Sequence, residues 1–301
     1  MTRPDFFIVG APKCGTTSLH QYLRQHPQVF MPLVKEVKYF GADRQPRHTP
    51  KLTLKEYLAL FQAAPAGVRV GEASVGYLRS STAAKEIAAF SPGAQAIVML
   101  RDPVEVMHAL HSELVFLGVE DLPDFSEALA AEPDRKAGRR IPPNINNPRG
   151  LFYREAVSFA EQVERYVDAL GREHLHVIVF DDFKADTAAS VRDTFRFLGV
   201  DDSFAPVLDV ANPSKVARSR IAQCVLSSPP GWMRTIARSL VPRTTRKRAY
   251  RAAMRLNARS QARAVMDPDL RRRLTAELAP EVERLSALVE RDLTHWSLPA
   301  A

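Results

Sequence analysis

A glycine-bounded loop near the N-terminus constrains the fold of this chain more than any other feature. The loop GAPKCGTTS, residues 10–18, follows a short apolar segment at 5–9 and precedes a helix expected over 16–25, before Pro27. A strand, a glycine loop and a helix in this order bring backbone amides and the positive end of a helix dipole to one point, where a phosphate can bind. The sequence therefore predicts an anion cradle that opens an α/β fold.

The spacing within this loop argues against an ordinary ATP or GTP site. Gly10 and Gly15 are spaced as in a nucleotide P-loop, but Lys13 precedes the second glycine and Thr16 occupies the position at which that motif has lysine. A tight turn with a solvent-facing lysine is the alternative interpretation of the loop. A magnesium-dependent P-loop-type kinase of a small metabolite is the alternative function.

Strands and helices alternate along the rest of the chain. Strands are predicted at 68–71, 95–100 and 176–180, and helices at 82–90, 104–117, 153–170 and 269–293. This alternation predicts a single α/β domain over residues 1–301, in which helices flank a mainly parallel sheet with a P-loop-like nucleotide-binding core. We expect a long surface loop at Glu132–Gly150 and a basic lid or insertion at about 212–265.

Charge is unevenly distributed along the chain. The formal net charge is +8, and Lys and Arg dominate the segment from Lys215 to Arg273. An anionic ligand is therefore expected, and a nucleotide, an acidic membrane surface or a nucleic acid would each satisfy this charge. The two cysteines, the charge of Asp5 inside the first apolar run and the absence of long apolar stretches together predict a cytoplasmic protein without a disulfide framework.

Two motifs resemble those of the sulfotransferases that depend on 3′-phosphoadenosine 5′-phosphosulfate (PAPS), a family whose bacterial members are related to the carbohydrate and heparan-type enzymes. Pro12–Leu19 resembles the family's binding loop for the 5′-phosphosulfate, and Leu100–Glu105 resembles its 3′-phosphate element at a strand end. The resemblance implies transfer of a sulfuryl group from PAPS to a hydroxyl of a carbohydrate, lipid or small natural product. Adenosine 3′,5′-bisphosphate would be the product, and no metal would be required.

The resemblance also implies which residues bind the donor. Lys13 would be catalytic as well as donor-binding, and the other donor-binding residues would be Pro12, Cys14, Gly15, Thr16, Thr17, Ser18, Arg101, Ser112, Lys215, Arg218 and Arg220. The last three belong to a late basic loop at 212–220, which closes over the nucleotide in relatives. Where relatives carry a serine for the 3′-phosphate, this chain has Ala109, and Ser112 is the candidate substitute one helical turn further on.

A third matching segment implies the general base. Pro32–Phe40 resembles the family's stretch of lysine, glutamate and paired aromatic residues, which makes Glu36 the catalytic base. Some relatives use a histidine, so His20, His108 and His111 are competing candidates. Without the resemblance, Glu36 would be interpreted as a solvated glutamate between two lysines.

Acidic residues after two predicted strands have weaker interpretations. Gly71–Leu78 matches a stretch that lines the acceptor side of the cleft in relatives, which gives Glu72 and Tyr77 a supporting role. Asp181 and Asp182 could be metal ligands, but capping of the following segment is the preferred interpretation, and we expect no metal.

A protein that binds a membrane surface or a nucleic acid is a further alternative. Trp232, Ile236 and Leu240 stand among basic residues between 234 and 248, a pattern that also fits a basic lid over a nucleotide. We expect a small-molecule, glycan or lipid acceptor, at most weak contact with anionic membranes, and no nucleic-acid partner. Short motifs determine neither the acceptor nor the oligomeric state.

Overall fold

The computed structural model describes residues 2–44, 51–143, 145, 147–209, 215–217, 245, 252–253, 256–260 and 264–298. The chain divides into two compact units. The first unit comprises Met1–Met107, Arg154–Asn212 and Pro268–Ala301, and the second comprises His108–Tyr153 and Pro213–Asp267. The expectation of one domain over 1–301 stays a prediction, and most of the basic segment at 212–265 lies outside the described residues.

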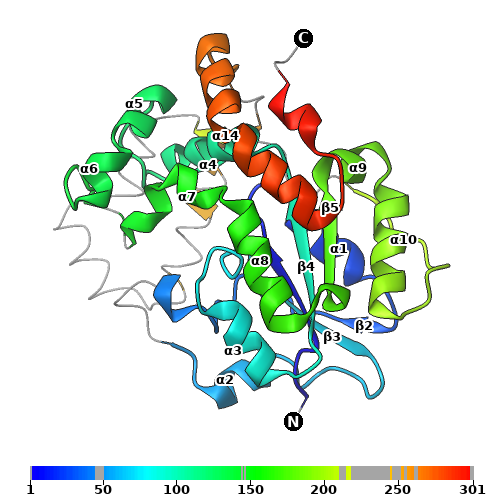
Figure 1. Ribbon diagram of the computed structural model, residues 1–301. Helices are drawn as coiled ribbons and strands as arrows, with labels where there is room; N and C mark the ends of the chain where they lie inside the picture. The colour runs from blue at the N-terminus through cyan, green and yellow to red at the C-terminus, as the bar shows by residue number, and fades with distance from the viewer. Residues whose placement is uncertain are drawn as a thin grey trace. The chain divides into compact units, whose positions relative to one another are not determined.

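The described residues of the first unit form a sheet of five parallel strands in the order β2-β3-β1-β4-β5 (Figure 1). The strands are β1 (Phe6–Gly10), β2 (Val29–Phe30), β3 (Arg69–Ala73), β4 (Gln95–Leu100) and β5 (Leu175–Val179). In the register of the sheet, Phe6 pairs with Gly71 on β3 and with Gln95 on β4. Every residue of β1 is buried, as expected of a parallel strand that is covered on both faces.

Helices cover both faces of this sheet. In Figure 1, α8 (Phe159–Leu170) lies in front of the sheet and α1 (Thr16–Leu23) behind it. Helix α8 packs against α3 (Ala83–Phe90) and α14 (Pro268–Val289), and α1 packs against α10 (Thr187–Leu198). The described part of the unit also contains short helices, among them α2 (Leu54–Ala59), α9 (Phe180–Ala185), η1 (Ala42–Arg44), η3 (Arg172–His174) and η4 (Thr294–Ser297).

Local signals in the sequence define several of these helices. The side chain of Asp186 caps α10 by accepting from the Ala189 amide at 2.9 Å, and Gly199 ends the helix in the left-handed conformation. Thr53 and Glu56 form a reciprocal capping box at the start of α2. None of the described helices combines the length and the hydrophobicity that a bilayer crossing needs.

The second unit contains the C-terminal part of α4 (Pro103–Phe116), together with α5 (Phe125–Ala130), α6 (Glu132–Lys136), η2 (Pro148–Leu151) and the antiparallel pair β6 (Lys215–Ala217) and β7 (Ala258–Ser260). A buried ion pair lies inside this unit. The Arg135 guanidinium donates to both oxygens of Glu120 at 2.7 and 2.6 Å, and the Tyr153 hydroxyl donates to the same carboxylate at 2.6 Å. Both charged side chains are inaccessible to solvent.

Most elements predicted from the sequence are present within one to four residues of their expected ends. The strand at 95–100 is confirmed with the same bounds, and the strands at 5–9, 68–71 and 176–180 are shifted by one or two residues. The expected helix at 153–170 is wrong as one element, because it breaks into α7 (Tyr153–Ala156) and α8. The long loop expected at 132–150 is also wrong in part, because it contains α6 and η2.

The interpretation of Asp181 and Asp182 as capping residues is wrong. Both lie in the first turn of α9, whose N-cap is Val179. Asp181 instead accepts from the Trp296 indole at 2.7 Å, and Asp182 pairs with Arg291 at 2.9 Å. These contacts hold the C-terminal turn η4 and the end of α14 against the start of α9.

Candidate active site

The predicted site residues of the first unit gather at the carboxyl edge of the sheet. The connections after β1 and β4 leave these adjacent strands in opposite directions, toward β2 and β5 respectively. This arrangement is the topological switch point at which open parallel sheets bind ligands. The glycine loop at 10–15 follows β1, Arg101 follows β4, and the turn at 74–78 follows β3.

Two glycines give the loop after β1 its shape. A Cβ on Gly10 would lie 2.5 Å from the Cβ of Leu78, so the close approach of these two backbones requires glycine. Gly15 is the N-cap of α1 with φ of +90°, a left-handed conformation that strains other residues. Because this N-cap has no side chain, no capping side chain competes for the amides of Thr16 and Thr17, whereas the Ser18 amide donates to the Gly15 carbonyl at 3.0 Å.

Lys13 and Cys14 differ in what they can contribute to this loop. Lys13 has a positive φ of 66°, and its carbonyl accepts from the Arg101 guanidinium at 3.5 Å, which joins the loop after β1 to the end of β4. The Cys14 side chain is fully buried, and burial raises the pKa of its thiol to about 12. Cys14 is therefore neither a nucleophile nor a side-chain ligand at neutral pH, and only its backbone can serve an anion.

Arg101 is held on several sides. Its guanidinium lies over the Phe180 ring at 4.9 Å from the ring centroid and donates to Glu105 at 3.2 Å. Arg271, on α14, pairs with the same Glu105 and also donates to Asp102 at 3.0 Å. The charge of Glu105 is thus shared between two arginines, and Asp102 neutralises the second of them, so the Arg101 guanidinium is held in place beside the glycine loop.

Glu36 lies beside the end of β3. Its amide donates to the Ala73 carbonyl at 2.8 Å, and its carboxylate accepts from the Val75 amide at 3.2 Å. Lys35 donates to the same carboxylate oxygen at 2.8 Å, and about a third of the Glu36 side chain is exposed. Hydrogen bonds to two backbone groups and to Lys35 therefore hold Glu36 in place, and its side chain remains partly exposed.

Glu72 and Tyr77, for which the motif implied a supporting role, are buried at the end of β3 and just after it. Glu72 is fully buried and Tyr77 is 2% exposed. The Glu72 carboxylate accepts from the hydroxyls of Tyr57, Ser74 and Tyr77 at 2.8, 2.6 and 3.0 Å. Burial raises the pKa of Glu72 to about 7, against the lowering effect of these three donors. Neither Tyr57 nor Ser74 was predicted from the sequence to contact Glu72, although Ser74 lies within the matched motif.

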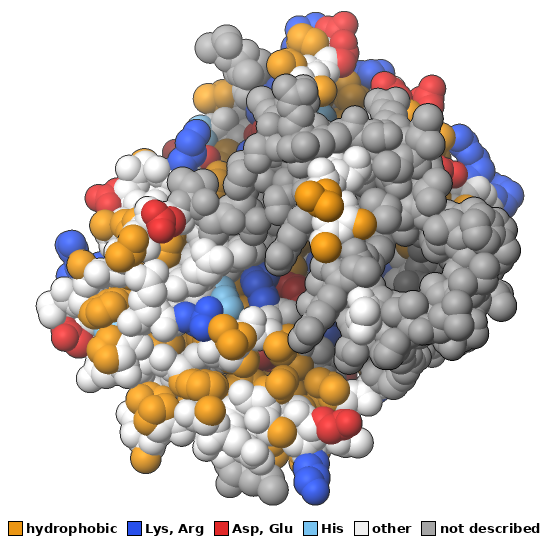
Figure 2. All heavy atoms as spheres, turned by 180° about the vertical axis from the view of Figure 1, so that it is seen from behind, with side chains coloured by type: hydrophobic (Ala, Val, Ile, Leu, Met, Phe, Trp, Pro, Cys, Tyr) orange, Lys and Arg blue, Asp and Glu red, His pale blue; other side chains and the backbone are white. Residues whose placement is uncertain are grey.

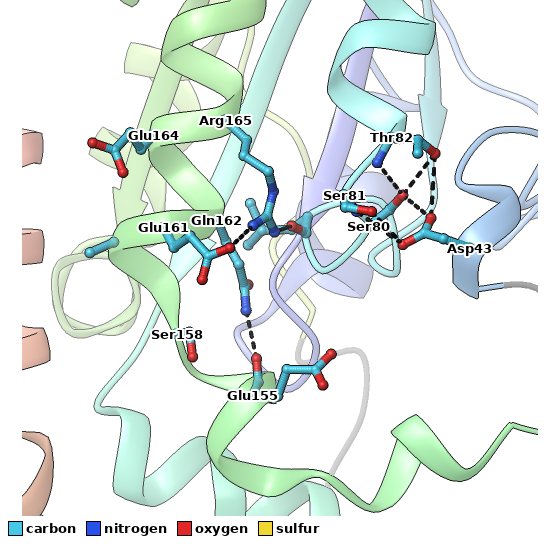
Figure 3. A network of polar contacts seen from close by, with 12 residues as sticks. Asp43, Ser80, Ser81, Thr82, Glu155, Ser158, Glu161, Gln162, Glu164 and Arg165 are labelled. Carbon is cyan, nitrogen blue, oxygen red and sulfur yellow. Dashed lines mark hydrogen bonds and ion pairs between the residues drawn. The ribbon is translucent and has the colours of Figure 1, made fainter. Parts of the chain in front are cut away.

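A second polar network anchors the chain after the segment that carries Glu36 (Figure 3). Asp43, on η1, accepts from the Ser80 hydroxyl and from the Ser81 amide at 3.0 Å, at the turn that precedes α3. From α8, Arg165 pairs with Glu161 and donates to the Leu78 carbonyl at 3.2 Å. The 78–82 turn is therefore held from both sides, and with it the close contact between Leu78 and Gly10.

The competing histidines occupy less suitable places. His20 lies buried on α1, and desolvation, assisted by the charge of Lys35, lowers its pKa to about 4. In the second unit, His111 is buried and hydrogen-bonded to the Leu122 carbonyl at 2.9 Å. The His108 ring packs against that of Phe125 at 5.3 Å between ring centroids, with the two planes tilted by 33°. These contacts favour structural roles for the histidines over contact with an acceptor.

The remaining predicted donor-binding residues lie in the second unit or outside the described residues. Ser112 donates to the His108 carbonyl at 2.8 Å within α4, and Ala109 is buried. The backbone of Lys215 belongs to β6, whereas Arg218, Arg220 and the hydrophobic residues at 232, 236 and 240 lie outside the described residues. Their roles stay predictions.

Hydrophobic side chains reach the surface beside Glu36. Leu33 is 80% exposed and Val34 is 54% exposed, and both precede Lys35 in the chain. Figure 2 shows hydrophobic side chains at the surface of the described residues on the face seen from behind. Over the described part of the chain, His, Cys, Asp and Glu form no group of three or more that could hold a metal ion.

Comparisons with known proteins agree on one family. A model of the sulfotransferase family matches residues 4–68. Human carbohydrate sulfotransferase 15 is 32% identical over a match that covers 35% of this chain and 26% of that protein. The bifunctional heparan sulfate N-deacetylase/N-sulfotransferase 4 of Mus musculus is 24% identical, and the match covers 65% of this chain and 22% of that protein. The chain thus corresponds to about a quarter of the length of these relatives.

A solved structure extends the similarity to nearly the whole chain. The crystal structure of a sulfotransferase from Alicyclobacillus acidocaldarius superposes with a TM-score of 0.74 and is 32% identical in sequence. The match covers 99% of this chain and 100% of that one, so the two proteins share one fold along their whole length. The chain therefore belongs to the sulfotransferase family.

Proposed function

We propose that this protein transfers the sulfuryl group of PAPS to a hydroxyl of a carbohydrate, lipid or small natural product. The observation that carries the proposal is the convergence of three predicted residues at one edge of the sheet. Lys13 follows β1, Arg101 follows β4 and donates to the Lys13 carbonyl, and Glu36 is bound to the backbone at the end of β3. A cation pair for an anionic donor and a carboxylate base are the groups that such a transfer needs.

The residues of the glycine loop fit the 5′ end of the donor. The required glycines at 10 and 15 and the uncapped start of α1 offer backbone amides of Gly15, Thr16 and Thr17 to a phosphate. Lys13 would add a charge on the same side of the loop. Arg101 would bind the 3′-phosphate, the group that distinguishes PAPS from ATP, through charge-assisted hydrogen bonds.

Two side chains would act on the transfer itself. When bound, PAPS supplies an activated sulfuryl group whose leaving oxygen gains negative charge as it departs. Lys13 would stabilise that charge, a contribution of about 3–4 kcal/mol for one well-placed donor. Glu36 would accept the proton of the acceptor hydroxyl as that oxygen attacks, which typically contributes about a hundredfold to ten-thousandfold in rate.

A carbohydrate is the first acceptor class to test. The names of two similar proteins refer to carbohydrate and to heparan sulfate. The exposed Leu33 and Val34 beside Glu36 would also suit an acceptor with an apolar part, such as a lipid or a small natural product. The assay therefore compares a heparan-type glycan, an alkyl glycoside and a long-chain alcohol.

Calorimetric titration with adenosine 3′,5′-bisphosphate tests the donor site. We expect tight binding in the absence of magnesium and weaker binding in the Lys13→Ala and Arg101→Ala variants. Adenosine 5′-monophosphate, which lacks the 3′-phosphate, should bind to wild type and Arg101→Ala with similar affinity. Binding of ATP with magnesium, without binding of the bisphosphate, would instead indicate a kinase.

Transfer of ³⁵S from labelled PAPS to the acceptor panel tests the reaction. We expect Glu36→Gln to reduce kcat by about a hundredfold or more while the affinity for the bisphosphate stays unchanged. A Glu113→Gln variant, which alters a partly exposed carboxylate on α4, serves as the matched control. Equal activity of Glu36→Gln and wild type would exclude Glu36 as the base.

A further inference from the structure

The segment that carries Glu36 has a backbone conformation that needs outside support. Glu36 and Lys38 both have positive φ values, 63° and 56°, although neither is glycine. Left-handed backbone at two non-glycine residues is unfavourable, and it persists where surrounding contacts determine it. The contacts that hold residues 36–40 therefore decide where the proposed base stands.

Side-chain hydroxyls supply part of this support. The Lys38 amide donates to the Ser74 hydroxyl at 3.0 Å. The amides of Tyr39 and Phe40 donate to the Tyr77 hydroxyl at 2.9 and 3.3 Å. Three consecutive backbone amides of the segment thus donate to the hydroxyl oxygens of Ser74 and Tyr77, which follow β3.

The direction of these hydrogen bonds depends on a third group. A hydroxyl has one proton to donate, and it accepts an amide through its lone pairs. Ser74 and Tyr77 both donate their protons to Glu72, and an ionised carboxylate can only accept. Glu72 therefore fixes both hydroxyls in the orientation that presents lone pairs to the amides of residues 38–40.

We propose that Glu72 is a positioning residue that acts through Ser74 and Tyr77 to hold the 36–40 segment, and thereby sets the place of the Glu36 carboxylate. The proposal rests on the proposed function for the role of Glu36. Glu72 itself is fully buried, and its carboxylate accepts from the hydroxyls of Tyr57, Ser74 and Tyr77. The Glu36 amide donates to the Ala73 carbonyl, and the Glu36 carboxylate accepts from the Val75 amide. Glu36 is therefore also bonded directly to the residues that follow Glu72 in the chain.

Tyr57 provides an internal control for this arrangement. Its hydroxyl also donates to Glu72, at 2.8 Å, and its ring stacks on that of Tyr39 at 4.0 Å between centroids. Tyr57→Phe removes one donor from the buried carboxylate but keeps the ring and both hydroxyls that accept the amides. Tyr77→Phe removes a donor of the same kind together with the acceptor for two amides. The two variants therefore differ mainly in whether the amides of Tyr39 and Phe40 keep their hydroxyl acceptor.

Hydrogen exchange of the 38–40 amides at pH 8 tests the proposal without an acceptor. We expect exchange to be about tenfold faster than in wild type at all three amides in Glu72→Gln and at the Tyr39 and Phe40 amides in Tyr77→Phe, and nearly unchanged in Tyr57→Phe. If Glu72→Gln does not fold, the two tyrosine variants carry the comparison. Equal exchange in Tyr77→Phe and Tyr57→Phe would overturn the proposal, because the cluster would then act on the fold as a whole.

Kinetics on the acceptor identified by the transfer assay give the second readout. We expect Glu72→Gln and Tyr77→Phe to lower kcat by about tenfold to a hundredfold, with calorimetric affinity for adenosine 3′,5′-bisphosphate within about twofold of wild type. Tyr57→Phe should keep kcat close to wild type. If wild type binds no bisphosphate, the proposed function fails, whereas faster amide exchange with unchanged kcat would overturn the positioning role alone.

Discussion

The Glu72→Gln variant should gain stability relative to wild type as the pH rises, because wild type loses unfolding free energy and the variant does not. Burial raises the pKa of Glu72 from 4.5 to about 7 in the folded protein, so the folded state holds this proton more tightly than the unfolded state does. Between pH 4.5 and 7, the unfolded chain has released the proton while the folded protein still binds it. Wild type therefore loses stability over this window, and the loss is complete above pH 7.

The magnitude follows from the same two pKa values. A difference from 4.5 to about 7 corresponds to about 3 kcal/mol of unfolding free energy. Glutamine does not titrate, so Glu72→Gln should not show this loss. We would measure urea unfolding of both proteins from pH 5 to pH 8 and plot the difference in unfolding free energy, which should rise by about 2–3 kcal/mol in favour of the variant.

Other titrating groups near Glu72 must be separated from this effect. The charge of Glu36 contributes to the raised pKa of Glu72, whereas burial raises the pKa of Tyr57, Tyr77 and Tyr166 and keeps these phenols protonated over the whole range. Repeating the comparison in a Glu36→Gln background removes the charge of Glu36. Most of the pH dependence of the stability difference should remain, because burial is the largest cause of the raised pKa of Glu72. A flat difference between pH 5 and pH 8 would refute the reasoning, because it would mean that the hydroxyl donors outweigh desolvation.

Three further outcomes follow from close packing, buried charge and the buried thiol. Gly10→Ala should reduce the unfolding free energy by about 1–3 kcal/mol, whereas Gly76→Ala, where a Cβ meets nothing within 4 Å, should have little effect in the same denaturation assay. Arg135→Met should cost about 3–5 kcal/mol, because it leaves a buried carboxylate unpaired, and Arg139→Met on an exposed ion pair should cost about 1 kcal/mol or less. In the folded protein, Cys14 should resist iodoacetamide at pH 8, and labelling as fast as that of a free thiol would contradict its burial and its pKa of about 12.

The sheet and the glycine loop were predictable because they depend on local patterns. The apolar run of β4 is bounded by Arg101 and Pro103, which end the strand and begin α4, so its limits could be read directly. The loop at 10–18 has its glycines between a strand and a helix, and the structure places it there. The proximity of Arg101 to Lys13 was predictable from the family resemblance, since the residues are 88 positions apart.

The features that were missed depend on contacts distant in sequence. Strand β2 has two residues, Val29 and Phe30, and forms because β3 offers it a partner, which no local pattern reveals. The break between α7 and α8 has no glycine or proline to mark it. The burial of Glu72 was not predicted, because the hydroxyl of Tyr57, 15 residues earlier in the chain, bonds to this carboxylate only after folding.

The contacts of Arg101 within the protein reduce the conformational entropy that a nucleotide would have to remove when it binds. The Arg101 guanidinium lies over the Phe180 ring, donates to Glu105 and donates to the Lys13 carbonyl, so contacts within the protein fix it on three sides. Much of the rotamer entropy of this long side chain is therefore lost during folding and not during association. Lysine keeps the charge but has neither the flat face nor the forked donors, so an Arg101→Lys protein would have to order its side chain anew for each ligand.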